Sequence, residues 1–226
     1  MRTTASITQL LSLEWNGTAI AGLADNTATA PLANLQLAFH TGFPGLAGTQ
    51  ITSECTYGGY ARVAVPRTTA GFTIAANKVS LASARNLPQC TSGGDTATWW
   101  SLGDAATGAG AIRRMGPLGS QLGAVTLAVT GNVVTIPGLT GLAVNDRIMF
   151  VPVSDSALPV AVTAGTSYFV LSVSGDNITI SATLGGAAIT FAGSGDGIAY
   201  KSNPAIITSA PAITPGLPAG VLIIEG

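Results

Sequence analysis

The first clear pattern in the chain is helical. In residues 6–15, SITQLLSLEW, apolar side chains recur at the spacing of one helix face: Ile7, Leu10, Leu11, Leu13. Ser6 is a suitable N-cap, and Asn16-Gly17 is a suitable stop. The pattern predicts a short N-terminal helix. The alternative is an arm that becomes ordered only when it binds a neighbouring molecule.

An alternating segment follows, and the rest of the chain is organised around it. Residues 37–41 alternate between two faces, which indicates a half-buried strand, and a second strand is predicted at residues 60–65 before Pro66. Residues 42–59 between them are too rich in glycine and proline for a helix or strand. Because a long loop in a compact domain is usually functional, we expect a contact surface here. The candidate contact residues are Phe43, Glu54, Tyr57, Tyr60, Arg62.

Short β segments come next. Residues 71–74 and 78–81 read as a hairpin, and residues 111–115 as a further strand. Residues 96–102 form a strand in which Trp99 and Trp100 point to opposite faces. One of these is expected to anchor the core. The other is either a satellite packing residue or a contact between subunits, since tryptophan is enriched at interfaces.

The pattern of the sequence changes at residue 123, where a series of short, regularly spaced β segments begins. Residues 125–130 and 133–136 flank Gly131-Asn132, a signal for a two-residue hairpin turn. Regularly spaced short strands follow at residues 147–151, 168–173, 178–181, 188–191 and 198–201, which indicates a small closed or sandwiched sheet. The apolar segments at 206–207 and 221–224 belong with the first part again. We therefore expect one domain of residues 1–122 with 201–226, and a second of residues 123–200 inserted into it.

The charge content narrows the possible partners. Charged residues make up 8% of the chain, against about a quarter in an average protein. A net charge of −1 gives no electrostatic case for nucleic acid or an anionic membrane. The start of the chain lacks the apolar segment of a signal peptide, so assembly in a host cytoplasm is expected. Cys55 and Cys90 are expected to be thiols rather than a disulfide.

The sequence lacks the groupings that enzymes need. His40 is the only histidine, and within a strand it is expected to pack or form hydrogen bonds rather than act as a base. Glu54 and Cys55 adjoin, but no base accompanies them. The aspartates lie in or beside turns, and the glycine runs lack a lysine and a following helix. We therefore expect no catalytic residue, no metal site and no cofactor.

Four segments carry a resemblance to a known group of proteins. LAFHTGFPGLAGTQ, SECTYGGYARVAV, LPQCTSGGDTATWWSLGD and ITPGLPAGVLIIEG, in this order, resemble a family of structural proteins of tailed bacteriophages, described variously as tail fibre, minor tail or head decoration proteins. The block from residue 123 resembles a small β-barrel module found in phage fibre and decoration proteins. The resemblance implies a virion component without enzymatic activity.

These observations lead to one architecture and two functions. The expected fold is all-β: a β-sandwich or jelly-roll-like domain with a short N-terminal helix, plus the inserted small barrel. The favoured function is a capsid cement protein, a homotrimer on the outer capsid surface that binds the major capsid protein. Its compact length favours this reading, because fibres usually carry long repeats. The alternative is a tail-fibre or other tail component whose module touches host surface glycans through exposed aromatic side chains.

Overall fold

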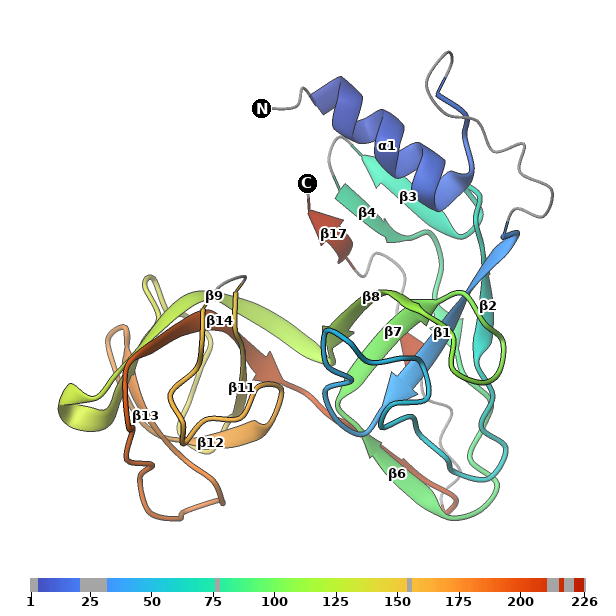
Figure 1. The fold of residues 1–226 in the computed structure, drawn as a ribbon. Coiled ribbons are helices and arrows are strands. Elements are labelled where there is room, and N and C mark those ends of the chain that lie inside the picture. Colours follow the sequence, from blue (N-terminus) through green and yellow to red (C-terminus); the bar gives the residue numbers. More distant parts are fainter. Residues whose placement is uncertain are drawn as a thin grey trace. The chain divides into compact units, whose positions relative to one another are not determined.

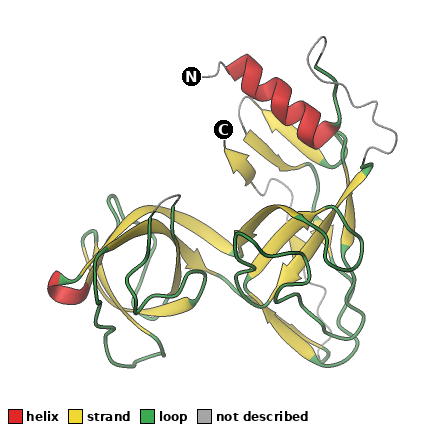
Figure 2. Ribbon diagram, viewed as in Figure 1, coloured by secondary structure: helices red, strands yellow, loops and turns green. Residues whose placement is uncertain are grey.

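The computed structural model describes residues 4–20, 32–75, 78–153, 156–210, 216–217 and 222–225. The chain divides into two compact units (Figure 1). Unit 1 comprises residues 1–116 and 206–226, and unit 2 comprises residues 117–205. The predicted all-β class is confirmed, with one short N-terminal helix and one small closed barrel (Figure 2). No helix within the described ranges is long and apolar enough to span a bilayer.

Unit 1 is built on a four-stranded sheet with the order β2-β1-β7-β8. Its strands are β1 (Asn34–His40), β2 (Val63–Pro66), β7 (Trp99–Gly103) and β8 (Ile112–Pro117). All five residues of β7 are buried, because this strand lies inside the sheet and is covered on both faces. The exposed fractions of Trp99 and Trp100 are only 2% and 5%. Both indoles are therefore buried within the chain itself.

Smaller sheets complete unit 1. A three-stranded sheet has the order β17-β4-β3, from β3 (Phe72–Ala75), β4 (Lys78–Leu81) and β17 (Leu222–Glu225). The predicted hairpin of β3 and β4 is confirmed, while Ala76 and Asn77 of its turn lie outside the described residues. Two strand pairs join distant parts of the chain: β5 (Arg85–Asn86) with β16 (Gly216–Leu217), and β6 (Gly94–Ala97) with β15 (Ala205–Thr208).

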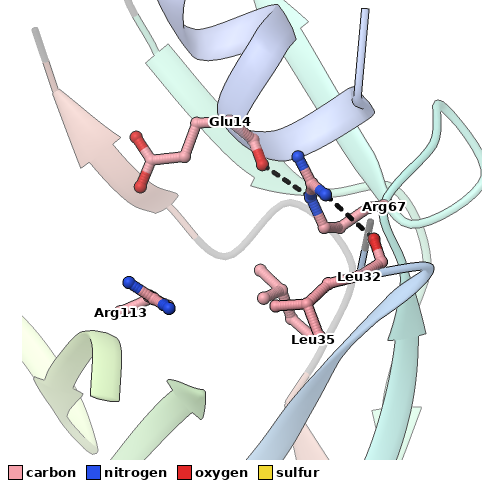
Figure 3. Close-up of a pocket in the computed structure, with 5 residues that line it drawn as sticks. All are labelled: Glu14, Leu32, Leu35, Arg67 and Arg113. Carbon is pink, nitrogen blue, oxygen red and sulfur yellow. Dashed lines mark hydrogen bonds between the residues drawn. The ribbon is translucent and has the colours of Figure 1, made fainter. Parts of the chain in front are cut away.

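The N-terminal helix α1 (Thr4–Asn16) is confirmed, although it begins before Ser6, so the predicted N-cap is wrong. It ends as predicted, with Gly17 in the left-handed region at φ 63°. Trp15 is fully buried, and its ring meets the ring of Phe72 edge-on at 5.1 Å. The guanidinium of Arg67 donates to the carbonyl oxygen of Glu14 at 2.8 Å (Figure 3). It also donates to the carbonyl oxygen of Leu13 at 2.8 Å. A cation thus satisfies carbonyls that every helix leaves unpaired at its C-terminus.

Unit 2 is a closed barrel with the order β10-β13-β12-β11-β14-β9. Its strands are β9 (Gly119–Ala128), β10 (Val133–Thr135), β11 (Arg147–Val151), β12 (Ser167–Ser174), β13 (Asn177–Ser181) and β14 (Gly195–Ser202). Inward-facing residues of every strand form its core: Val125, Leu127, Val134, Ile148, Phe150, Tyr168, Val170, Ile178, Ile180, Ala199. The period-two pattern of the sequence therefore marks the inner face correctly.

Two details of the barrel differ from expectation. The predicted two-residue turn at Gly131-Asn132 is longer, since Val133 pairs with Ala128 and a short 3-10 turn, η1 (Thr130–Asn132), lies between them. The strand predicted at residues 188–191 is absent, and Ala188 makes only an isolated bridge to Ser181. Phe191 is nevertheless 2% exposed. Phe191 fills part of the barrel core from a loop. A short apolar run of this kind cannot be distinguished from a strand by its periodicity.

The chain enters and leaves the barrel where β9 begins and β14 ends, at residues 118–119 and 202–203, which are called the neck below. Pairing of β9 with β14 continues to Gly119↔Ser202, and just beyond it the Asn203 N–H donates to the Leu118 carbonyl at 2.8 Å. The chain thus enters and leaves unit 2 at one point. Such an arrangement suits an inserted domain, since a loop closed by a folded insert with neighbouring ends costs little entropy.

The insertion hypothesis predicts that unit 1 folds without the barrel. Replacing residues 119–202 by an Asn-Gly turn between Leu118 and Asn203 should leave a cooperatively folding protein, because the two joined residues already share a hydrogen bond. Circular dichroism and calorimetry measure this directly. Residues 117–205 expressed alone should also fold, with the marginal stability of a small β domain. A deletion variant without a cooperative thermal transition would mean that the two parts share one core.

Candidate contact loop

The loop of residues 42–59, called the contact loop below, is held from beneath by a buried ion pair. Arg62 Nε lies 2.6 Å from Glu54 Oε1, and Arg62 Nη2 lies 2.8 Å from Glu54 Oε2. The side chains are only 3% and 14% exposed. This two-point contact is the geometry in which guanidinium binds carboxylate most strongly. It ties the end of the loop to the start of the strand that follows.

The other donors of Arg62 bind a second loop, residues 104–110, and Gln50 of the contact loop. Nη1 donates to the carbonyl of Ala105 at 2.8 Å and to Gln50 Oε1 at 3.4 Å, while Nη2 donates to the carbonyl of Gly108 at 2.8 Å. Together with the ion pair, these bonds use all five N–H donors of the guanidinium. The buried charge is therefore fully satisfied, which is the condition under which such a charge can be tolerated.

Gln50 extends this network into the sheet. Its side chain is fully buried, donates from Nε2 to the Gln36 carbonyl of β1 at 3.0 Å, and accepts from the Ala105 N–H at 3.1 Å. Glycine is required at two neighbouring positions. A Cβ on Gly103 would lie 2.1 Å from Gln50 Cδ, and one on Gly110 would lie 2.4 Å from Gln50 Oε1.

Tyr60 links the ion pair to the central strand. Its hydroxyl donates to Glu54 Oε1 at 2.8 Å and accepts from the Phe39 N–H at 3.3 Å. Burial, and then the adjacent Glu54 carboxylate, raise the pKa of Tyr60. The phenol therefore remains a hydrogen-bond donor at any physiological pH.

His40 is a buried structural residue, in agreement with the expectation for it. It is fully buried, with Nδ1 2.9 Å from the Thr52 carbonyl oxygen and Nε2 2.7 Å from Ser101 Oγ. Since a carbonyl can only accept, Nδ1 carries the proton and Nε2 accepts from the Ser101 hydroxyl. Burial lowers the pKa of His40 below its usual value.

The last residues of the contact loop are held by Tyr57 and Asp95. The Tyr57 hydroxyl donates to the Pro88 carbonyl at 2.8 Å, and Asp95 Oδ2 accepts from the backbone N–H of Thr56 and of Tyr57 at 2.6 and 2.9 Å. Cys55 and Cys90 are buried and unpaired. Burial raises the pKa of Cys55 to about 12, so this thiol does not supply a nucleophilic thiolate.

The candidate contact residues thus come together, but mostly in the interior of the chain. Glu54, Tyr60 and Arg62 form one hydrogen-bonded network, and Tyr57 packs edge-on against Tyr60 with 5.3 Å between ring centroids. Phe43 stacks on Trp99 at 4.7 Å and remains partly exposed. A direct contact of these side chains with a partner stays a prediction. Their visible role is to fix the shape of the loop.

The residues that the contact loop does expose were missed by the sequence reasoning. Leu46 is 88% exposed and Ile51 is 53% exposed. The loop therefore exposes two large aliphatic side chains beside the small polar Ser53 and Thr56, while the side chain of its one charged residue, Glu54, is largely buried. The sequence held one hint that the charged side chain of this loop is buried: Glu54 and Arg62, of opposite charge, lie eight residues apart in a chain with very few charges.

A small pocket beneath the end of α1 is lined by Glu14, Leu32, Leu35, Arg67, Arg113 and has a volume of about 260 Å³ (Figure 3). Its cations already have partners: Arg67 donates to backbone carbonyls, and Arg113 Nη2 lies 2.8 Å from Asp104 Oδ2. Among the described residues, no group of three or more histidine, cysteine, aspartate or glutamate side chains could hold a metal ion.

These features define an all-β protein in which polar groups brace a loop that presents aliphatic side chains. Comparison with known families gives a closer identification. Residues 16–136, more than half of the chain, match the family described as podophage GP4 fiber I protein gp80. The chain belongs to this family, and it is therefore a structural protein of a bacteriophage virion. No curated protein and no solved structure matches the chain.

The matched range includes the contact loop, its bracing residues, and the first two strands of the barrel, β9 and β10. It ends before residues 203–226, so the resemblance of ITPGLPAGVLIIEG lies outside it. The prediction that the barrel is a phage module of its own stays a prediction.

The bracing network predicts a large loss of stability when Arg62 is removed. Arg62→Ala leaves the Glu54 carboxylate buried without a partner, which should lower the free energy of unfolding by about 3–5 kcal/mol. Denaturant titration measures the change. The matched control is Arg113→Ala, which removes an ion pair whose arginine is 50% exposed and should cost less than about 1 kcal/mol. Equal effects for the two variants would contradict the assigned role of Arg62.

The burial of His40 should make the folded protein less stable in mild acid. Since burial holds its folded-state pKa below 6.5, the unfolded chain takes up a proton first as the pH falls. The free energy of unfolding should keep its full value above about pH 6.5. It should decrease as the pH falls from there toward the lowered pKa of His40 in the folded state. Melting temperatures between pH 7.5 and 5 test this in a protein with one histidine. His40→Gln should flatten the profile, and an unchanged slope in that variant would refute the explanation.

Proposed function

We propose that this protein is a non-enzymatic fibre component of the virion and acts as a homotrimer. The supporting observation is the family match, whose description names a fibre protein and which spans the contact loop. The sequence reasoning favoured a capsid cement protein because the chain is short and lacks repeats. Shortness is a weak argument, however, since a fibre can be assembled from several different chains.

The contact loop supplies the surface for association between subunits. Leu46 and Ile51 are held outward on a backbone that the Arg62–Glu54 network fixes. Rigid presentation lowers the entropy lost on association, and aliphatic groups surrounded by uncharged residues suit a closed symmetric interface. The loop therefore favours copies of this chain as the partners that cover it.

The structure argues against glycan binding through exposed aromatic rings on the barrel. Phe150, Tyr168 and Phe191 point into the barrel core. Phe169 and Tyr200 are half-buried, and the Phe169 ring is covered by the guanidinium of Arg147 at 5.4 Å. A different contact chemistry is therefore needed if the barrel meets the host.

The test of the proposal is the position of the protein on the particle. Antibody-gold labelling of intact virions should mark the tail region, and light scattering of the purified protein should give the mass of three chains at micromolar concentration. Leu46→Asp combined with Ile51→Asp should convert trimer to a monomer that still unfolds cooperatively, because both side chains are exposed in the single chain. Labelling spread over the capsid shell would restore the cement reading and refute the fibre assignment.

A further inference from the structure

The last part of the chain is bound to unit 1 strand by strand. Three strands follow the neck, β15, β16 and β17, and we call them the donor strands. Each pairs with a different strand of residues 78–97: β15 with β6, β16 with β5, and β17 with β4 (Figure 1). We call β4, β5 and β6 the acceptor strands. Among the described strands, no donor strand pairs with another donor strand. They are therefore held as an extended peptide is held when it adds strands to the edges of a sheet.

The acceptor strands fit the donor strands closely. Ile207 of β15 and Leu217 of β16 are 1% and 5% exposed, so two donor strands each bury an apolar side chain in unit 1. A Cβ on Gly94 would lie 2.5 Å from the Ile207 carbonyl oxygen, and one on Gly216 would lie 2.6 Å from the Arg85 carbonyl oxygen. Without the donor strands, β5 and β6 would have no partner among the described strands. Unit 1 is therefore incomplete until a donor segment pairs with it.

The donor strands are joined to the preceding chain by a very short connection. The Asn203 N–H is bonded to the Leu118 carbonyl at the neck, and β15 begins at Ala205, so Pro204 alone lies between them. The ring of proline fixes φ, which makes this connection stiff as well as short. Short, stiff hinges favour exchange of the following segment between copies, because they limit how the chain can turn back onto its own domain.

We propose that the acceptor strands of one copy receive the donor strands of a neighbouring copy, so that the homotrimer is closed by strand exchange. This inference rests on the trimer of the proposed function. In the single chain, donor and acceptor strands belong to the same copy. Exchange keeps the strand pairings described above and requires a change of direction only at Pro204. Each copy then gives one segment and receives one, which is the condition for a closed symmetric ring.

Exchange gives the contact loop and the donor strands separate roles. The donor strands make the same contacts in either copy, so exchange alone adds little to the equilibrium affinity. Leu46 and Ile51 of the contact loop bring the copies together, and without them the strands return to their own chain. Exchanged strands have to leave their acceptor before two copies separate, so dissociation becomes as slow as partial unfolding. A trimer held in this way persists after dilution.

The test places a pair of cysteines across a donor and an acceptor strand. Leu222 of β17 is the register partner of Ser80 of β4. After mild oxidation of the trimer, the variant with Ser80→Cys and Leu222→Cys should run on a non-reducing gel as species of two and three chains, and reduction should return them to one chain. The natural Cys55 and Cys90 are buried, and wild-type protein treated in the same way corrects for them.

The matched control carries Thr73→Cys with Ser80→Cys. These positions are register partners within the β3–β4 hairpin, so their disulfide should form inside one chain whether or not strands are exchanged. Lys78→Cys with Glu225→Cys is a second donor–acceptor pair, and it serves if the first variant does not fold, because Lys78 is exposed at the end of its strand.

The outcomes separate this inference from the proposed function. Disulfides between chains in the donor–acceptor variants, with a single-chain band for the hairpin control, support strand exchange. Single-chain bands for the donor–acceptor variants, in protein that light scattering shows to be a trimer, overturn strand exchange and leave the trimer standing. Absence of any disulfide in both donor–acceptor variants also overturns it, because β17 then does not pair with β4. A monomeric mass for the wild-type protein refutes the proposed trimer together with the exchange.

Discussion

The buried ion pair of Arg62 and Glu54 is the interaction on which the contact loop depends. A loop of glycine, threonine and small apolar residues has too few large side chains to fix its own shape. One guanidinium with five satisfied donors gathers the end of this loop, the loop at residues 104–110, and the amide of Gln50. The pair adds little net energy over an apolar core, because desolvation offsets most of the attraction. Its contribution is to select one conformation, since any other arrangement leaves a buried charge unsatisfied.

The fold was predictable where the pattern of side chains reports a local period. Strands of the barrel such as residues 147–151 alternate cleanly, and the buried face follows from the alternation. Helix α1 was readable from its spacing and from Gly17. The plug formed by Phe191 was misread as a strand, because a short apolar run looks the same whether it pairs or only fills space. Its role depends on the distant Asn132, which no local window contains.

The sequence predicted where the contact loop lies, but not which of its side chains are buried and which are exposed. Density of glycine and proline located the contact loop correctly. Charged and aromatic residues were expected to face a partner, because such residues are usually exposed or enriched at interfaces. In this chain Arg62 finds its partners in two separate loops, residues 42–59 and 104–110, so its burial is a long-range property. Leu46 and Ile51 attracted no notice because an isolated aliphatic residue carries no signal until the surrounding charges are known to point inward.

The neck of the barrel has a mechanical consequence. Because the Asn203 N–H and the Leu118 carbonyl are hydrogen-bonded, chain tension that runs through unit 1 can pass directly between these two residues. While this hydrogen bond holds, part of that tension bypasses the barrel. A pull applied to the barrel itself acts instead along β9 and β14 together, so that their hydrogen bonds are not peeled apart one at a time. A virion part subject to drag and collision would keep its barrel folded under loads that strain the scaffold bearing it.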